Sequence, residues 1–313
     1  MLQGLKILPT NSKINFIGFR LITYIISGIL AFGSLGLFFI KGVNYGIDFK
    51  GGTMIEVRTP APANLAEMRS NLTALNLGAI SLQEFGSSQD ILIRFEQQKG
   101  DEKDQLSAIE KVKESLGADM EYRRIETVGP AVGAELVENS IYAVLWALVA
   151  MLIYIWLRFE WQFGVCAILS LAHDALSILG LYSLFGLEFN LTAIVAILIT
   201  IGYSINDTVV IYDRVRENLR KFKKMALEDV LNLSINETLS RTILTSSSTL
   251  LALFALYFWG GEVISTYSLP ILFGVAVGTY SSIFLAAPLL KSFNFKVRKD
   301  DDKKVEFQND QKN

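Results

Sequence analysis

The chain alternates between long apolar runs and polar segments, and this pattern predicts its architecture. The first apolar run, Leu21–Ile40, carries no charge and is long enough to cross about 30 Å of hydrocarbon as a helix. A cleaved signal peptide is the competing interpretation. The run is too long for a signal core and has no obvious small-x-small cleavage site, so a retained helix is favoured. Later apolar runs predict five more spans: Ser140–Leu157, Phe163–Phe185, Leu191–Tyr212, Ile243–Trp259 and Leu269–Leu290.

Residues 42–128 are polar and follow a different pattern. Alternation of apolar and polar residues indicates strands, and apolar residues at helical spacing indicate two helices. The predicted order is β-α-β-β-α-β, which favours a ferredoxin-like α+β external domain between the first and second spans. The elements are Thr53–Arg58, Leu65–Leu75, Ala79–Phe85, Ile91–Phe95, Gln105–Leu116 and Met120–Thr127.

The predicted fold class is therefore a membrane α-helical protein with six transmembrane helices and one external domain. A short N-terminal segment (1–20) precedes the first span (21–41), and the external domain occupies 42–128. Spans two to six fill 129–290. The charged tail, 291–313, is expected to be disordered because it lacks the apolar residues that would form a core.

Composition supports this class and excludes others. Hydrophobic residues make up 51% of the 313, and the mean hydropathy is +0.37, more apolar than soluble domains usually are. The net charge of -2 gives no reason to expect nucleic acid as a partner. Cys166 is the one cysteine and His173 the one histidine, which excludes an internal disulfide and multi-Cys or multi-His metal sites. We expect no cofactor and no metal.

The distribution of basic residues predicts the orientation. With six spans, the two termini share a side with the link after the second span and with the basic segment 214–224. The short loops on the other side contain Glu188 and Glu262 and no basic residue. Both termini are therefore expected in the cytoplasm and residues 42–128 outside.

Candidate chemistry lies near the end of the fourth span. Thr200, Ser204 and Asp207 share one helical face, and Asn206 lies on the adjacent face. A carboxylate inside a span is costly unless a partner neutralises it or its protonation has a function. Arg241 begins the next span, which runs in the opposite direction, so the two charges fall at similar depths.

This arrangement predicts an ion-coupling site. Asp207 would load and release a proton as it moves between contact with Arg241 and a drier environment. The hydroxyl-rich stretch that follows, which includes Thr245, can hydrogen-bond across helices or line a file of water. In the alternative interpretation, Asp207 forms a fixed interhelical hydrogen bond and Arg241 extends to the membrane surface.

Three other groups of residues are interpreted mainly as structural. His173 and Asp174 lie in the middle of the third span and are equally compatible with a proton relay and with a polar pair that fixes helix packing. A small-residue face in the sixth span indicates close helix packing. Both connections between the external domain and the membrane are interpreted as architecture or hinges. The residues of these structural motifs are Gly46, Asp48, Gly51, Gly52, Gly129, Pro130, Gly274 and Gly278.

Several motifs together resemble the SecF family of protein-export membrane proteins, which belongs to the resistance–nodulation–division superfamily. The matching segments are Gly46–Thr53, Glu126–Pro130, Ala172–Asp174, Gly202–Thr208 with Asp213-Arg214, and Arg241-Thr242. The resemblance implies six helices that pair with six from SecD, association with the SecYEG channel, and a location in the bacterial plasma (inner) membrane. It also implies use of the proton (or sodium) motive force to help move unfolded preproteins.

The resemblance places Asp207 and Arg241 at positions tied to proton conduction. The principal acidic site of the family's transport path is usually placed on SecD. Arg241 is therefore expected to face a carboxylate of that partner as well as, or instead of, Asp207.

Other functions remain as alternatives. An exporter of lipids or small molecules would need a roomy external pocket, and a domain of about 85 residues is expected to be too small for one. A purely structural subunit of the export channel is the other alternative. An intramembrane enzyme is disfavoured, because adjacent residues such as His173 and Asp174 point in different directions on a helix. The protein is expected not to be an enzyme.

Overall fold

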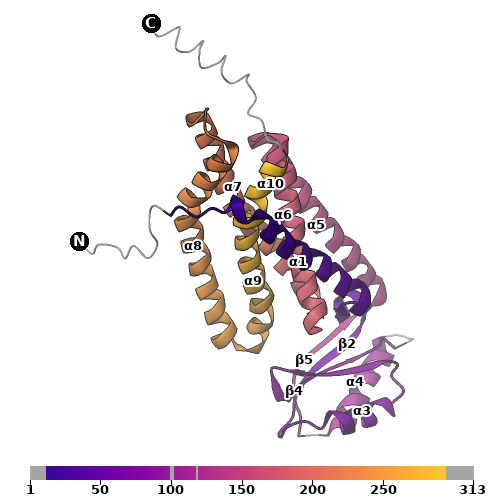
Figure 1. Ribbon diagram of the computed structural model, residues 1–313. Helices are drawn as coiled ribbons and strands as arrows, with labels where there is room; N and C mark the ends of the chain where they lie inside the picture. Colours follow the sequence, from indigo (N-terminus) through magenta and orange to yellow (C-terminus); the bar gives the residue numbers. More distant parts are fainter. Residues whose placement is uncertain (1–11, 99–101, 118, 294–313) are drawn as a thin grey trace, which may run out of the picture.

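The computed structural model describes residues 12–98, 102–117 and 119–293, and within them six helical segments are long and apolar enough to cross a membrane. The predicted fold class is confirmed. The external domain lies at one end of the helix bundle, together with the α6–α7 and α8–α9 turns (Figure 1). The membrane helices are α1 (Arg20–Lys41), α5 (Pro130–Arg158), α6 (Trp161–Phe185), α7 (Leu191–Lys221), α8 (Leu227–Trp259) and the unit α9 (Gly261–Ser281), η2 (Ser282–Ala286) and α10 (Ala287–Ser292).

Three helices begin well before their apolar runs, and one of them, α9, starts at Gly261 in place of Leu269. Helix α5 starts at Pro130 in place of Ser140, with Pro in the first turn, where its missing N–H does no harm. Helix α8 starts at Leu227 in place of Ile243. Its polar first half is amphipathic and buries Val230 and Leu231, so this part of the helix is stabilised by packing.

The last span is interrupted by a π-helical turn, η2, between α9 and α10. A π-turn inserts an extra residue into the helix and rotates the side chains that follow it, and such turns are frequent at functional sites. This turn lies where the last span crosses α6 and α7.

The external domain has the predicted element order. Its four-stranded antiparallel sheet has the order β3-β4-β2-β5, with α3 and α4 covering one face (Figure 1). This is the ferredoxin-like arrangement. The elements are β2 (Gly52–Arg58), α3 (Leu65–Thr73), β3 (Ile80–Phe85), β4 (Ser87–Phe95), α4 (Glu102–Leu116) and β5 (Glu121–Val128).

The two faces of this sheet differ in chemistry. The face under the helices forms an apolar core that includes Ile55, Ile93 and Val112. The other face carries the carboxylate of Asp90, which is 1% exposed and accepts two hydrogen bonds from Arg58, at 2.7 and 2.6 Å. These bonds from Arg58 lower the pKa of Asp90 to about 2.

Four short elements join the parts. The 3-10 turn η1 (Ile17–Phe19) precedes α1, and α2 (Ile47–Lys50) lies between α1 and the domain. The strands β1 (Asn44–Tyr45) and β6 (Glu188–Phe189) pair in parallel and link the segment after α1 to the α6–α7 loop. The tail from 294 onward, predicted to be disordered, lies outside the described residues.

Candidate ion-coupling site

Helix α7 turns three polar side chains into the bundle, as their spacing predicts. Thr200 and Ser204 are fully buried, and Asp207 is 3% exposed. Asp207 Oδ2 accepts a hydrogen bond from Ser246 Oγ of α8 at 3.5 Å. Ser246 Oγ in turn lies 2.8 Å from Thr279 Oγ1 of α9. The carboxylate therefore lies where α7, α8 and α9 meet.

Arg241 forms no direct ion pair with this carboxylate, although its charge lies close enough to act on it. The residue is exposed on α8, and no ion pair within 4.0 Å joins it to Asp207 among the described residues. The reason is helical geometry: residues five apart differ by about 140° around the axis, so Arg241 and Ser246 lie on different faces. Thr242 and Ser246, one turn apart, form the inward face.

The other two predicted members of the site lie at its edge. Asn206 is exposed on α7, next to Asp207. Thr245 Oγ1 donates within its own helix, to the carbonyl oxygens of Arg241 and Thr242, both at 3.0 Å. Asp207 and Arg241 thus form no ion pair within 4.0 Å among the described residues, and their coupling, like a role for Arg241 toward a partner's carboxylate, stays a prediction.

Asp174 of α6 forms a denser set of contacts. It is fully buried, and its Oδ2 accepts hydrogen bonds from Ser204 of α7 at 2.6 Å and Ser281 of α9 at 2.8 Å. Its Oδ1 lies 3.0 Å from His173 Nδ1, so the side chains of these adjacent residues bend together although their Cα–Cβ bonds diverge. His173 Nε2 is buried and has no hydrogen-bond partner among the described residues. The contacts favour the packing interpretation, and the relay stays a prediction.

The π-turn supplies further hydroxyl groups to α7. Ser282 Oγ lies 2.9 Å from Thr208 Oγ1 and 3.1 Å from the carbonyl oxygen of Ser204, to which it donates. Ser281 and Ser282 belong to the small-residue face predicted for the sixth span, and sequence reasoning did not expect them as polar contacts of Asp174 and α7. Two adjacent serines in an apolar run are the signal that could have found them.

Close packing of α9 on α7 depends on two glycines. A Cβ at Gly274 would collide with the Thr200 side chain, and one at Gly278 would lie 3.0 Å from Ser204 Cβ. These are the two glycines of the predicted small-residue face. Their lack of a side chain lets the α9 backbone approach the polar face of α7.

The external end of α7 is held by the segment that enters the domain, residues 42–51, called the junction segment here. Asp48 Oδ2 accepts a hydrogen bond from the backbone N–H of Leu191, the first residue of α7, at 2.9 Å. Asn190 caps the same helix by accepting from Thr192 N–H at 3.1 Å. A carboxylate at a helix N-terminus also interacts favourably with the helix dipole. Asp48 thus connects the junction segment to the helix that carries Asp207.

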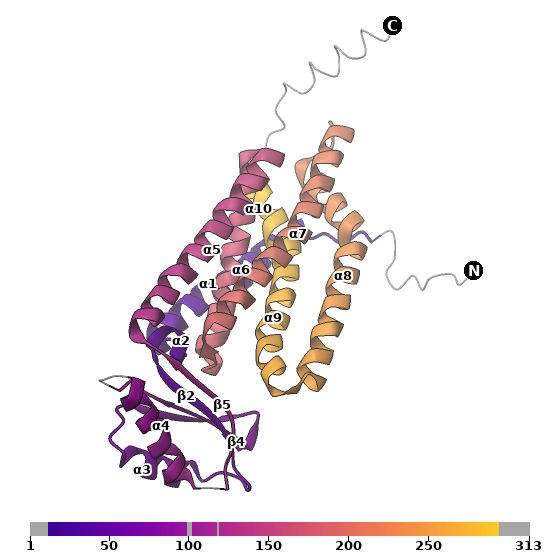
Figure 2. The ribbon, with the colours of Figure 1, turned by 180° about the vertical axis from the view of Figure 1, so that it is seen from behind.

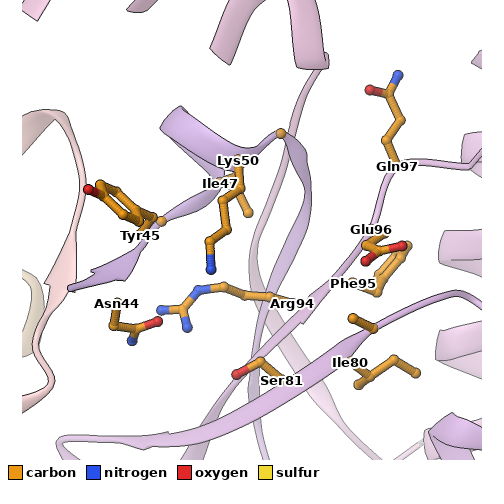
Figure 3. A pocket seen from close by; sticks show the side chains of 13 residues that line it. Asn44, Tyr45, Ile47, Lys50, Ile80, Ser81, Arg94, Phe95, Glu96 and Gln97 are labelled. Carbon is orange, nitrogen blue, oxygen red and sulfur yellow. The ribbon is translucent and has the colours of Figure 1, made fainter. Parts of the chain in front are cut away.

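A second contact joins the sheet to the membrane part. Arg94 of β4 forms a hydrogen-bonded ion pair with Glu188 of the α6–α7 loop. Figure 3 shows the Lys50 amine pointing toward the Arg94 guanidinium, in a cavity between the junction segment and the sheet. The cavity has a volume of about 560 Å³, within the usual size range of ligand pockets. A cavity of this size was not expected in the external domain of residues 42–128; it lies where the junction segment faces the sheet.

The remaining structural residues shape the two connections. Gly52 has a φ of 118°, and a Cβ there would lie 2.6 Å from the carbonyl oxygen of Phe95, so only glycine fits without strain. Gly51 is the C-cap of α2, and Gly46 is its N-cap. At the return to the membrane, Gly129 is the N-cap of α5, and Pro130 is the first residue of that helix.

Comparison with known protein families shows which family this chain belongs to. Residues 108–296 match the family model described as protein export membrane protein SecD/SecF, C-terminal, and residues 36–59 match the SecD/SecF GG motif. The first match alone covers more than half of the chain. The chain belongs to the SecD/SecF family. The junction segment, with Asp48 and Gly51, and the Gly52 that follows it fall inside the region matched by the GG motif.

Individual family members are similar over nearly the whole chain. The protein translocase subunit SecF of Rickettsia rickettsii (strain Sheila Smith) is 46% identical over 293 residues, covering 92% of this chain and 94% of the relative. The SecF subunit of Rickettsia prowazekii (strain Madrid E) is 45% identical over the same length. The resemblance to SecF seen in the sequence is therefore confirmed: these similar members of the SecD/SecF family are SecF subunits.

Solved structures of this family share the fold. SecDF from Thermus thermophilus, described as a translocon-associated membrane protein, superposes with a TM-score of 0.81 at 36% identity, over 92% of this chain. SecDF in a super-membrane-facing form superposes with a TM-score of 0.67 at 35% identity, over 97% of this chain. This chain spans 40% of the length of each of those chains.

Proposed function

We propose that this chain is the SecF-type subunit of a bacterial inner-membrane translocase, where it couples ion movement to movement of the external domain and so assists preprotein export. The observation that carries the proposal is the construction of α7. Its external end is fixed to the junction segment by Asp48, and its buried polar face holds Asp207. The two residues are connected by one continuous helix, about 24 Å from Leu191 to Asp207 at 1.5 Å per residue.

A change in the surroundings of Asp207 would then act on the domain directly. If α7 tilts or shifts when the carboxylate gains or loses a proton, its N-terminus carries Asp48 and the β1–β6 pair with it. One charge crossing 100 mV releases about 2.3 kcal/mol, so a few ions supply enough free energy for a domain movement. This role requires no covalent chemistry, and we infer that the subunit is not an enzyme. Protons and sodium ions are both compatible with a carboxylate site.

The exposed polar face of α7 and α8 supports a membrane partner. Arg241 and Asn206 are both exposed on membrane helices, and an uncompensated guanidinium in lipid is costly. A second membrane subunit with a carboxylate opposite Arg241 would remove this cost. We infer that SecD is this partner, which agrees with this chain spanning 40% of the SecDF chains. SecYEG and the unfolded preprotein are inferred as further partners from the translocase name of the relatives.

One observation favours the alternative function of an exporter of lipids or small molecules. The cavity beside the junction segment is large enough for such a ligand. Two cationic side chains, Lys50 and Arg94, project into it, and its lining also includes the acidic Glu96 (Figure 3). Arg94 is already paired with Glu188, and Glu96 is acidic, so this charged lining does not suit a neutral lipid or an apolar drug. We therefore favour the translocase subunit.

The experiment replaces Asp207 by Asn, which keeps its shape and removes its titration, and Arg241 by Ala. Each variant is expressed as the sole copy in a strain that depends on this gene, and export of a secreted reporter is followed with and without an uncoupler. Both variants are expected to lose the uncoupler-sensitive part of export. The control is Asp229→Asn, an exposed carboxylate in the first turn of α8, which is expected to export normally.

If Asp207→Asn and Arg241→Ala both export as well as the unchanged chain, the coupling role of this pair is wrong. A purely structural subunit would then be favoured. Co-purification with SecD and the channel distinguishes that result from an independent exporter, which would require neither partner.

A further inference from the structure

A second cavity lies between the end of α5 and the last turns of α7. These helix ends lie at the end of the bundle opposite the external domain (Figure 2). Its volume is about 410 Å³. Four basic and two acidic residues line it: Arg158, Asp213, Arg216, Glu217, Arg220 and Lys221. The ion-coupling proposal uses none of these side chains.

Both acidic residues at this cavity are already engaged. Asp213 pairs with Arg158 at 3.2 Å, and Glu217 accepts from Arg214, which lies outside the lining, at 2.5 Å. Arg216 donates to the carbonyl oxygen of Arg158 at 3.0 Å, which holds its guanidinium between the two helices. The lining therefore carries a net positive charge, and the side chains of Arg158 and Arg216 are held in place by these contacts.

The position of the cavity along α7 matches the membrane boundary. Asp213 lies 22 residues beyond Leu191, roughly 33 Å along the helix, just past a hydrocarbon layer of about 30 Å. Trp156 at the end of α5 and Trp161 at the start of α6 are 67% and 57% exposed. Exposed tryptophans are typical of the membrane–water interface. The basic cavity thus lies at the depth of lipid headgroups.

Exposed apolar side chains lie on α5, the helix whose last residue, Arg158, lines the cavity. Ile153 and Leu157 are 49% and 85% exposed on this helix. Acyl chains can cover such a surface while a headgroup occupies the basic cavity. Basic pockets between membrane helices on the cytoplasmic side are known to bind anionic headgroups.

We propose that this cavity binds the headgroup of an anionic phospholipid, with its phosphate near Arg216, Arg220 and Lys221 and its acyl chains along α5. The lipid bridges the end of α5 and the part of α7 that leaves the membrane. The proposal is independent of Asp207 and of ion coupling, and the failure of one leaves the other intact.

Native mass spectrometry of the full-length, detergent-purified chain tests this proposal. Dioleoyl phosphatidylglycerol and dioleoyl phosphatidylcholine are added in turn, and the retained adducts are counted. One phosphatidylglycerol is expected to be retained in preference to phosphatidylcholine. Each basic side chain near the surface contributes about five-fold in affinity, so the triple change of Arg216, Arg220 and Lys221 to Gln is expected to weaken binding on the order of 100-fold.

Two further variants serve as controls for this experiment. Arg69→Gln, Lys103→Gln and Lys111→Gln together remove three exposed charges from the external domain and are expected to change nothing. Asp213→Asn removes an acid from the wall and is expected to strengthen phosphatidylglycerol binding. It also provides a result if the triple variant fails to fold.

Equal retention of the two lipids, or unchanged phosphatidylglycerol binding in the triple variant, would overturn the proposal. Displacement of the lipid by inorganic phosphate at millimolar concentration would also overturn it, because the cavity would then recognise free phosphate and not a lipid.

Discussion

The two substitutions Asp174→Asn and Asp174→Ala separate a packing role of this buried carboxylate from a titrating role. Both hydroxyl donors, Ser204 and Ser281, reach the same oxygen, Oδ2. The single oxygen of an asparagine amide has two lone pairs and can accept both bonds. Its NH2 group would replace Oδ1, 3.0 Å from His173 Nδ1, and can donate to a neutral imidazole there. Asp174→Asn is therefore expected to preserve every contact of the cluster.

Asp174→Ala removes these contacts and gives the larger effect. Polar contacts within membrane proteins contribute about 0.6 kcal/mol on average and at most about 1.7 kcal/mol each. Loss of the two hydroxyl bonds is thus expected to lower the free energy of unfolding by about 1 to 3 kcal/mol, before any cost of the cavity. Asp174→Asn is expected to stay within about 0.5 kcal/mol of the unchanged chain.

Reversible unfolding in mixed dodecyl sulfate and maltoside micelles, followed by tryptophan fluorescence, measures these free energies. The control is Ser170→Ala, one turn earlier on α6, because the Ser170 hydroxyl is buried and has no hydrogen-bond partner among the described residues. This control is expected to be neutral. If Asp174→Asn destabilises as much as Asp174→Ala, the negative charge itself holds the cluster, and the packing argument is wrong. Loss of uncoupler-sensitive export in a stable Asp174→Asn variant would favour the proton relay.

Three further predictions concern other parts of the chain. The pKa of Asp90 is lower in the folded domain than the usual 3.8, so its contribution to stability is present above pH 4 and disappears as the pH falls toward 2; hydrogen exchange of the sheet should show a loss of about 2 kcal/mol over that range. Gly274→Ala should cost about 1 to 3 kcal/mol in micellar unfolding because the new methyl group meets Thr200, and adding Thr200→Gly should recover part of the loss. A double-mutant cycle of Arg94→Gln and Glu188→Gln, measured by hydrogen exchange of β6, should give a coupling free energy of about 1 to 3 kcal/mol. If the effects of the two substitutions are additive, the ion pair does not connect the sheet to the loop.

Much of the fold can be predicted from sequence because it depends on local periodicity. The apolar run of α1 fits a lipid environment, and its pattern shows this directly. The alternation in β2 marks a strand, although β2 lies inside the sheet and is buried along nearly its whole length. The start of α8 could not be found in this way. Residues 227–242 are polar enough to resemble a loop, and they form a helix because one side packs on the rest of the bundle.

The candidate site was only partly predictable for a related reason. Helical spacing places Thr200, Ser204 and Asp207 on one face, and the structure agrees. Spacing within one helix gives no information on rotation relative to the next helix. Arg241 was therefore expected to meet Asp207, although it lies on another face of α8. The Arg94–Glu188 pair joins residues 94 positions apart, and no local pattern indicates such a contact.

The contacts at the external end of α7 set a condition on any coupling mechanism. The hydrogen bond from Leu191 to Asp48 and the ion pair between Arg94 and Glu188 are both charge-assisted, and each is worth about 1.5 to 3 kcal/mol. One ion crossing 100 mV releases about 2.3 kcal/mol, enough to break one of these contacts but not both. A domain movement driven by single ions would therefore keep one contact as a pivot while the other opens. Asp48 holds the helix itself and Arg94 holds only the loop before it, so the geometry favours release of Arg94 and rotation about Asp48.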